Sequence, residues 1–248
     1  MTKVGVIGAA GNMGSLACGW VQEADGLELV AQITEDNSIE DLADAEVAID
    51  FTHPGVVMDH VAWCIDHGVH LVVGTSGFTD ERLATIEKKL GSDPAVGVLV
   101  VPNFSIGAVL MMRFAAEAAW FFESVEVVEL HHPTKLDAPS GTSIRTAHLV
   151  AAARASAGLD AMPDATADDP VGARGGTVAG VRVHSVRARG LVAHQEVILG
   201  NGGETLTIRH DMPDRVAAMP GVVASIRYVV DNPGLTVGLE SVLGLGPA

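Results

Sequence analysis

The first hundred residues alternate short apolar runs with segments of helical spacing. The strand-like runs are residues 3–8, 27–34, 46–51, 70–74 and 96–102, and the helix-like segments include residues 12–24, 54–68 and 79–91. Repeated strands joined by helices of about a dozen residues form a parallel sheet with helices on both faces. We therefore expect an α/β domain built on a Rossmann-like, doubly wound parallel sheet.

The pattern changes after residue 105. Residues 108–121 and 142–158 read as helices and 124–132 as a strand, whereas the Pro-, Gly- and Asp-rich stretch from Leu159 to about Gly180 is expected to be irregular. Three consecutive strand-like runs, residues 181–190, 191–200 and 204–211, predict a mixed or antiparallel sheet in a second, α+β domain. A closing helix (215–232) and strand (234–239) resemble the first domain. We expect domain boundaries at 1–105, completed by 216–248, and 106–215.

Charge and cysteine content narrow the functional classes. The formal net charge is −16, which argues against a nucleic-acid partner because such binding needs a basic face. Cys18 and Cys64 are the only cysteines, and we expect buried free thiols. No signal-peptide pattern opens the chain and no apolar run reaches the ~20 residues of a membrane span. These features predict a cytoplasmic protein without a membrane partner.

A glycine-rich turn lies between the first strand and the first helix. Gly8, Gly11 and Gly14 form a GxxGxxG pattern there. Glycine allows the backbone to turn tightly and approach a pyrophosphate, while the N-terminus of the next helix attracts the phosphate charge. Close packing alone can also select such glycines, but the position at the first strand-to-helix turn favours dinucleotide binding.

The ends of the following strands are the other candidate cofactor contacts. The second strand ends at Thr34, followed by Glu35 and Asp36 without a nearby Arg or Lys, which favours NAD over NADP, although a solvated acidic loop is an alternative. The segments GTSGF (74–78) and VPNFS (101–105) follow later strands, where ligands collect in this architecture, and each could also be a simple turn. We expect His53, in DFTHP, to be structural rather than catalytic.

The segment ELHHPTKLDAPSGT, residues 129–142, concentrates polar chemistry. Adjacent histidines without HExxH or paired cysteines make a zinc site improbable, and Ser140 lacks the G-x-S-x-G context of a nucleophile. Ser140 is placed as a helix N-cap, so Gly141 and Thr142 could bind a carboxylate through backbone N–H groups. His132 and Lys135 would add positive charge, and a histidine or lysine could supply a proton during hydride transfer. A plain polar loop is the alternative.

These motifs together resemble the dihydrodipicolinate reductase family, in particular its actinobacterial members. The resemblance runs nearly end to end through GAAGNMG, DFTHP, VVGTSGF, VPNFSIGAVL, ELHHPTKLDAPSGT, GLVAHQEVILG, ETLTIRHD and PGLTVGLE. It implies an NADH- or NADPH-dependent reduction of 4-hydroxy-tetrahydrodipicolinate, a cyclic dicarboxylate, and a homotetramer assembled through the second domain. Ala10, Asn12 and Thr34 depart from residues common in the family, so the resemblance leaves the choice between the two cofactors open.

The resemblance also implies residue roles. His131 would be the acid/base residue and Lys135 the proton donor. The substrate would be bound by His132, Lys135, Ser140, Gly141 and Thr142. The cofactor would be contacted by Gly8, Ala9, Ala10, Gly11, Asn12, Met13, Thr34, Gly74, Thr75, Ser76, Val101, Pro102, Asn103 and Phe104.

Two other functions remain possible from the sequence. A non-catalytic Rossmann protein could sense nicotinamide state through the same glycine turn, but it would not need His131 and Lys135 beside a carboxylate site. A different two-domain dehydrogenase could act on an amino or hydroxy acid, and only substrate choice separates it from the reductase.

Overall fold

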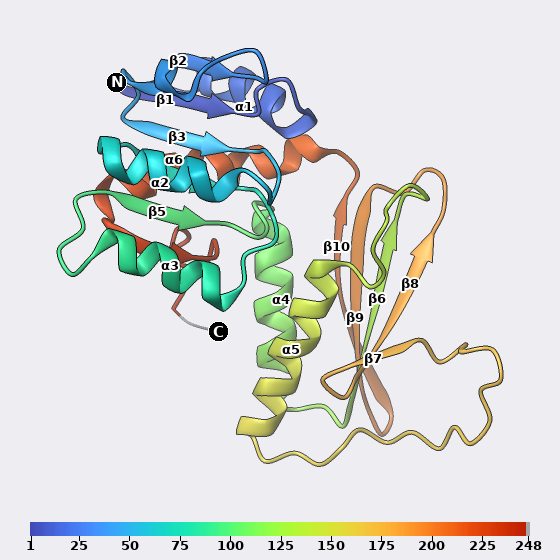
Figure 1. Cartoon of the computed structure of the whole chain (residues 1–248). Coiled ribbons are helices and arrows are strands. Elements are labelled where there is room, and N and C mark those ends of the chain that lie inside the picture. Colours follow the sequence, from blue (N-terminus) through green and yellow to red (C-terminus); the bar gives the residue numbers. More distant parts are fainter. Residues whose placement is uncertain (247–248) are drawn as a thin grey trace. The chain divides into compact units, whose positions relative to one another are not determined.

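The computed structural model describes residues 1–246 and divides into two compact units (Figure 1). Of the described residues, the first contains Met1–Ile106 and 215–246, and the second contains Gly107–Asp214. Each unit has its own sheet and its own hydrophobic core.

The first unit is built on a six-stranded parallel sheet in the order β11-β5-β4-β3-β1-β2. The strands are β1 (Thr2–Ile7), β2 (Leu27–Ile33), β3 (Val47–Asp50), β4 (His70–Val73), β5 (Gly97–Val100) and β11 (Gly234–Val237). The helices that pack on it are α1 (Asn12–Glu23), α2 (Val57–His67), α3 (Asp80–Leu90) and α6 (Met219–Asp231), with short 3-10 turns η1 (Ile39–Leu42) and η2 (Arg215–Ala218). The predicted doubly wound sheet is confirmed.

The order in which strands are added to this parallel sheet reverses at β1. It pairs with β2 on one side and with β3 on the other, and the chain then continues outward through β4 and β5. Crossovers that leave in opposite directions open a crevice at the carboxyl ends of these strands. The last strand, β11, pairs with β5, so the end of the described chain adds the outer strand of the same sheet.

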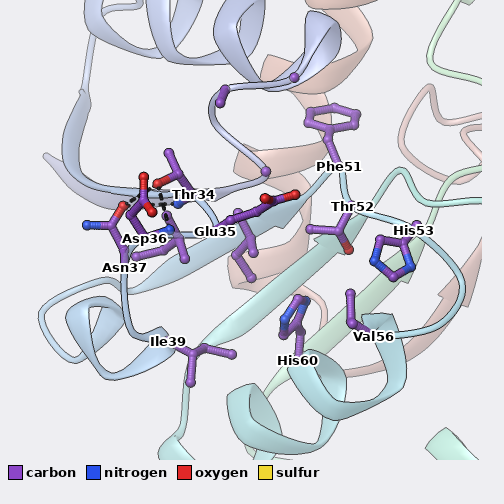
Figure 2. A pocket seen from close by; sticks show the side chains of 15 residues that line it. Thr34, Glu35, Asp36, Asn37, Ile39, Phe51, Thr52, His53, Val56 and His60 are labelled. Carbon is purple, nitrogen blue, oxygen red and sulfur yellow. Dashed lines mark hydrogen bonds between the residues drawn. The ribbon is translucent and has the colours of Figure 1, made fainter.

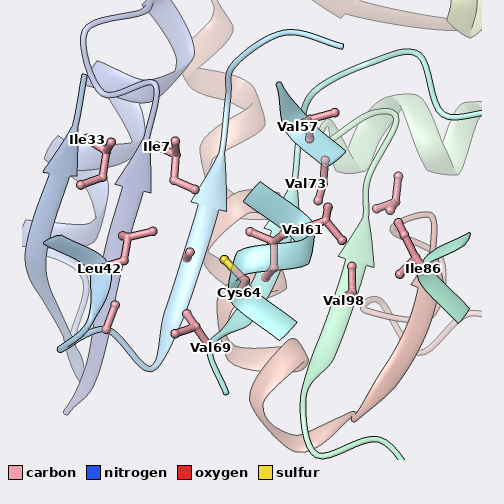
Figure 3. Packing of buried hydrophobic residues seen from close by; sticks show 14 of the residues in the cluster. Ile7, Ile33, Leu42, Val57, Val61, Cys64, Val69, Val73, Ile86 and Val98 are labelled. Carbon is pink, nitrogen blue, oxygen red and sulfur yellow. The ribbon is translucent and has the colours of Figure 1, made fainter. Parts of the chain in front are cut away.

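The core and helix ends of the first unit follow from local sequence. Buried aliphatic side chains of the strands pack against Val57, Val61 and Cys64 of α2 and Ile86 of α3 (Figure 3). Thr79 is the N-cap residue of α3, and its side chain accepts a hydrogen bond from the N–H of Arg82. The expectation of free, buried thiols is confirmed for Cys18 and Cys64.

The second unit is a five-stranded mixed sheet in the order β10-β9-β6-β8-β7. Its strands are β6 (Ser124–His131), β7 (Gly176–Val178), β8 (Val181–Arg187), β9 (Ala193–Asn201) and β10 (Glu204–Met212). Only β6 and β8 run parallel, while the other neighbours are antiparallel, which confirms the predicted mixed sheet. Helices α4 (Ile106–Ala118) and α5 (Gly141–Ser156) contribute Ala115, Ala147 and Val150 to its core, and Ala119 joins them from the residue after α4.

The prediction of an irregular connection from Leu159 to Gly180 is wrong at its end. Strand β7 pairs antiparallel with β8 through a hairpin whose two loop residues, Ala179 and Gly180, both have positive φ, 48° and 84°. Such two-residue turns favour Asn-Gly, and the Ala-Gly pair here gives a weak sequence signal.

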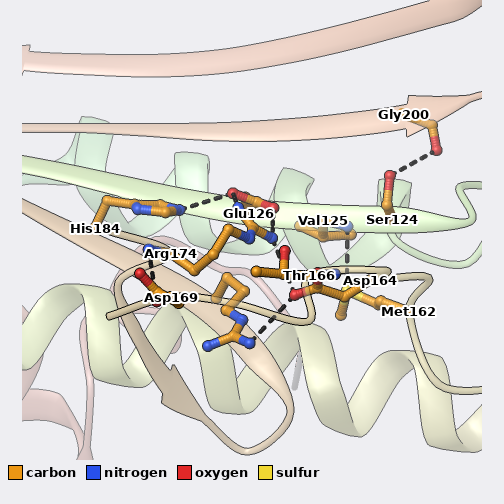
Figure 4. Close-up of polar contacts among 11 residues, drawn as sticks. Ser124, Val125, Glu126, Met162, Asp164, Thr166, Asp169, Arg174, His184 and Gly200 are labelled. Atoms are coloured by element: carbon orange, nitrogen blue, oxygen red, sulfur yellow. Dashed lines mark hydrogen bonds and ion pairs between the residues drawn. The ribbon is translucent and has the colours of Figure 1, made fainter. Parts of the chain in front are cut away.

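Ionic contacts hold the irregular part of this connection against the sheet (Figure 4). Arg174 binds both oxygens of Glu126, at 2.6 and 3.2 Å, and Arg174 and Arg182 both contact Asp164, at 3.3 and 3.2 Å. His184 also contacts Glu126, at 2.7 Å. These side chains fix a segment that has few apolar residues of its own.

Across residues 1–246, none of the helices combines the length and the apolar character that a membrane-spanning helix requires.

Candidate active site

The glycine turn brings three segments of backbone into close approach. Gly8 has φ +80°, and a Cβ on it would lie 2.6 Å from the carbonyl oxygen of Phe51. A Cβ on Gly14 would lie 2.1 Å from the carbonyl oxygen of Gly8. Gly11 is the N-cap residue of α1 and has no side chain to occupy the end of the helix. The first N–H groups of α1 therefore lie beside a turn whose glycines carry no side chains, which suits a phosphate.

A cavity of about 700 Å³ lies at the carboxyl ends of β1, β2 and β3, next to this turn (Figure 2). Figure 2 shows Thr34, Asp36 and Asn37 on one side and Thr52, His53 and His60 on the other. Of the predicted cofactor residues, Gly8, Ala10, Gly11 and Thr34 line it, Ala9 belongs to the same turn, and Asn12 and Met13 begin α1. The remaining predicted cofactor residues follow β4 and β5 and do not line this cavity: Gly74, Thr75, Ser76, Val101, Pro102, Asn103 and Phe104.

The cavity is acidic on the β2 side. Glu35 and Asp36 line it, and its described lining includes neither Arg nor Lys. The Thr34 hydroxyl donates to Oδ1 of Asn37 at 2.8 Å, and the Thr34 N–H donates to the same oxygen at 3.1 Å. The turn after β2 is thus held by Thr34 and Asn37, which leaves Glu35 and Asp36 exposed.

A buried carboxylate, which the sequence motifs did not single out, organises the strand ends. Asp50 accepts hydrogen bonds from the Thr52 N–H (2.9 Å) and from the hydroxyls of Thr52 and Thr75 (both 2.7 Å), and it contacts Nδ1 of His60 at 2.6 Å. Burial raises the pKa of Asp50, but these contacts outweigh burial and hold that pKa below its usual value. The predicted cofactor residue Thr75 therefore uses its hydroxyl to tie the turn after β4 to the turn after β3.

Gly74 lies where two aromatic rings meet. Phe51 and Phe104 pack edge to face with ring centroids 5.6 Å apart, and a Cβ on Gly74 would lie 2.3 Å from the ring of Phe51 and 2.8 Å from that of Phe104. The three turns after β3, β4 and β5 are therefore packed together. His53 makes a local contact in this region, where its Nδ1 accepts from the N–H of Gly55 at 3.2 Å.

In the second unit, the strand β6 presents Glu129 and His131 on one face, since they are two residues apart. Glu129 is fully buried, its carboxylate contacts Nδ1 of His131, and Arg187 binds both of its oxygens at 2.8 Å. Burial lowers the pKa of His131, and although Glu129 opposes that effect, the pKa stays below the usual value. The E-x-H spacing in the sequence could have identified Glu129 as a partner of His131.

The loop after β6 holds the other predicted residues. His132 Nδ1 lies 2.7 Å from the Thr134 hydroxyl, and Lys135 Nζ lies 2.8 Å from Asp137 Oδ1. Ser140 is the N-cap residue of α5, as predicted, and its hydroxyl accepts from the Ser143 N–H at 3.2 Å. Gly141 is exposed and begins the helix, with Thr142 next to it. The structure therefore places all five predicted substrate residues in one loop and helix start.

Groups of three or more His, Cys, Asp or Glu side chains arranged to hold a metal ion are absent from residues 1–246.

The doubly wound sheet, the glycine turn and the crevice beside it define a dinucleotide-binding protein of the Rossmann class. A model of the dihydrodipicolinate reductase N-terminus matches residues 2–104, and a model of the C-terminus of the same family matches residues 107–243. The chain belongs to the dihydrodipicolinate reductase family, and the resemblance noted from the sequence is confirmed.

Individual relatives agree with this assignment. The 4-hydroxy-tetrahydrodipicolinate reductase of Cutibacterium acnes is 57% identical over 99% of this chain and 100% of its own length. The enzyme of the same name from Nocardia farcinica is 56% identical over 98% of this chain and 99% of its own length. The solved structure of a dipicolinate-bound dihydrodipicolinate reductase from Paenisporosarcina sp. TG-14 matches with a TM-score of 0.87 and 36% identity. The match covers 97% of this chain and 99% of that protein. A probable dehydrogenase from Thermotoga maritima, 12% identical with a TM-score of 0.58, shares the fold.

Proposed function

We propose that this chain reduces 4-hydroxy-tetrahydrodipicolinate to tetrahydrodipicolinate with NADH or NADPH, a step of diaminopimelate and lysine biosynthesis. Family membership over nearly the whole chain supports this reaction. The observation that carries it is the presence of His131, His132 and Lys135 in the segment before the N-terminus of α5, because a dicarboxylate substrate needs cations and N–H donors close to a proton source.

The residues of the first unit fit a nicotinamide dinucleotide. The close approach of Gly14 to the Gly8 carbonyl leaves room only for backbone, so a pyrophosphate can approach the N–H groups of α1. When bound, the cofactor supplies a hydride to C4 of the substrate. In this proposal the cofactor contacts come from the turn at residues 8–13, from Thr34, and from residues 74–76 and 101–104.

The residues of the second unit handle the substrate and its protons. His131 acts as the acid/base residue and Lys135 donates the proton that accompanies hydride transfer and loss of the hydroxyl as water. His132, Lys135, Ser140, Gly141 and Thr142 bind the carboxylates. Because the helix α5 begins at Gly141, its first N–H groups and the positive end of its dipole face that region.

The cofactor choice follows from the charge of the cavity in the first unit. Glu35 and Asp36 line it, and they disfavour the additional 2′-phosphate of NADPH by repulsion. We therefore propose that NADH is used at least as well as NADPH.

The chain's partners and location follow the same proposal. Residues 1–105 and 216–248 form the dinucleotide domain, and residues 106–215 form a domain for substrate binding and for assembly of a homotetramer. The net charge of −16 argues against a nucleic-acid partner. We place the enzyme in the cytoplasm, without a membrane partner.

The test is substrate dependence of NADH oxidation, followed by its absorbance. Oxidation should require the condensation product of pyruvate and aspartate semialdehyde, and omission of either precursor should abolish it. Binding of NADH without any oxidation would favour a non-catalytic nicotinamide sensor instead. Faster oxidation with a simple 2-oxo acid would favour a different two-domain dehydrogenase.

A further inference from the structure

An unbroken series of polar contacts connects the two residues to which proton transfer is assigned. Nδ1 of His131 contacts the carboxylate of Glu129, and both oxygens of that carboxylate are bound by Arg187 at 2.8 Å. Arg187 also donates from Nη2 to the carbonyl oxygen of Asp137 at 2.8 Å. The Asp137 carboxylate in turn lies 2.8 Å from Nζ of Lys135. Arg187 therefore contacts both Glu129, on the strand that carries His131, and Asp137, in the loop that carries Lys135.

The strand pairing places Arg187 for this role. In the parallel pair β6–β8, His131 is opposite Arg187 and Glu129 is opposite Ser185, so all four side chains project from the same face. The guanidinium can form two parallel hydrogen bonds with one carboxylate and still offer a donor to a carbonyl, which a lysine cannot. Glu129 is fully buried, so its charge requires this pairing.

We propose that Arg187 is a positioning residue for the reduction, which orients the His131 ring through Glu129 and holds the Lys135 loop through the carbonyl of Asp137. This inference rests on the proposed roles of His131 and Lys135. The Arg187 guanidinium acts on these two residues through the Glu129 carboxylate and through the carbonyl of Asp137.

The orientation has a consequence for proton transfer. Because Nδ1 of His131 is engaged by Glu129, Nε2 is the nitrogen left for exchange with the substrate. Burial lowers the pKa of His131 most, Glu129 raises it, and Lys135 and Arg187 lower it further. Loss of the Arg187 charge should therefore raise the pKa of His131. Loss of the hydrogen bond from Arg187 to the Asp137 carbonyl should make the loop that carries Lys135 more mobile.

The experiment compares three variants of the full-length enzyme with a matched control. Arg187→Lys keeps the charge but not the fork of donors, and Arg187→Met removes both. The double variant Glu129→Gln/Arg187→Met leaves no unpaired buried charge, so it separates folding from catalysis. Arg154→Lys is the control, because Arg154 is another arginine of this unit whose guanidinium is held by hydrogen bonds, to the carbonyls of Phe122, Glu123 and Asp160.

We expect kcat of Arg187→Lys to fall by about tenfold to a hundredfold, since small misplacements of reacting groups have effects of that order. The Kd for NADH should stay at the wild-type value. The pH profile of the wild type should contain an apparent pKa that belongs to His131, which is identified by its disappearance in His131→Gln. Arg187→Met should raise that pKa. The double variant should recover the wild-type Tm but not the wild-type kcat, and Arg154→Lys should lower Tm with little change in kcat.

Wild-type kcat and an unshifted pH profile in Arg187→Lys and in the double variant would overturn the positioning role. Full recovery of kcat together with Tm in the double variant would also overturn it, since Arg187 would then act only on folding. Failure of the proposed function has a different signature, in which His131→Gln and Lys135→Ala retain wild-type turnover.

Discussion

Nδ1 of His60 lies 2.6 Å from Oδ2 of Asp50, a carboxylate that is fully buried at the end of β3. The other oxygen of Asp50 accepts from Thr52 and Thr75, so one side chain fixes the turns after β3 and β4. His60 also lines the cavity proposed for the cofactor. The shape of that cavity wall therefore depends on a charge that the solvent does not reach.

The first prediction concerns that charge. Asp50→Asn should lower the free energy of unfolding by about 2 to 4 kcal/mol at pH 7, because buried donors lose a charged acceptor. The pKa of Asp50 in the folded state lies below its usual value of 3.8, so its ionisation stabilises the fold above that pH, and the contribution disappears as the pH falls through the folded pKa. Urea unfolding at several pH values measures this.

The difference between wild type and Asp50→Asn should therefore shrink as the pH is lowered below about 4. Asp66→Asn serves as the control, since Asp66 is an exposed partner of Lys89 and should have a small effect. A constant difference across the whole range would contradict the assignment of a stabilising charge to Asp50.

The second prediction concerns the glycine turn. Gly14→Ala places a methyl group 2.1 Å from the Gly8 carbonyl oxygen, so the turn must move and affinity for NADH should fall at least about tenfold. Gly19→Ala is a matched control on the same helix, because a Cβ there has none of the described atoms within 4 Å. That control should keep its Kd for NADH and gain up to about 1 kcal/mol of stability. Calorimetric titration with NADH distinguishes the two, and equal affinities would refute this account of the turn.

The third prediction concerns cofactor choice. Wild-type kcat/KM with NADH should equal or exceed that with NADPH. The double variant Glu35→Gln/Asp36→Asn should raise the NADPH-to-NADH ratio of kcat/KM about three- to tenfold at low salt, because it removes two charges that repel the 2′-phosphate. Glu81→Gln/Glu87→Gln on α3 changes the net charge equally, away from the cavity lining, and should leave the ratio unchanged. A strong NADPH preference in the wild type would show that the acidic turn does not govern the choice.

Most of the fold could be predicted from the sequence because its elements are bounded by strong local signals. The helix α3 has a Thr79 cap, acids in its first turn and Gly91 at its end, and the parallel strands are nearly continuous apolar runs. Strand β7 was missed because it is three residues long and its turn uses Ala179 at a positive φ. Its stability comes from pairing with β8, which is a tertiary property.

The candidate site was predictable where its residues are contiguous in sequence. His131 to Thr142 form one motif, so the resemblance identified them together. Asp50 and Arg187 were not given roles, because their contacts join residues that are far apart in the chain, such as Asp50 with Thr75 and Arg187 with Glu129. Only the paired strands bring these side chains together.

The most direct test of the central claim compares Lys135→Ala with wild type in turnover and in NADH binding. Lys89→Ala is the control, because Lys89 also forms a salt bridge, with Asp66, and lies on α3. We predict that Lys135→Ala lowers kcat by about a hundredfold or more, the usual scale for loss of a general acid, while its Kd for NADH and the kcat of Lys89→Ala remain at wild-type values. Wild-type turnover in Lys135→Ala would contradict the assignment of Lys135 as the proton donor.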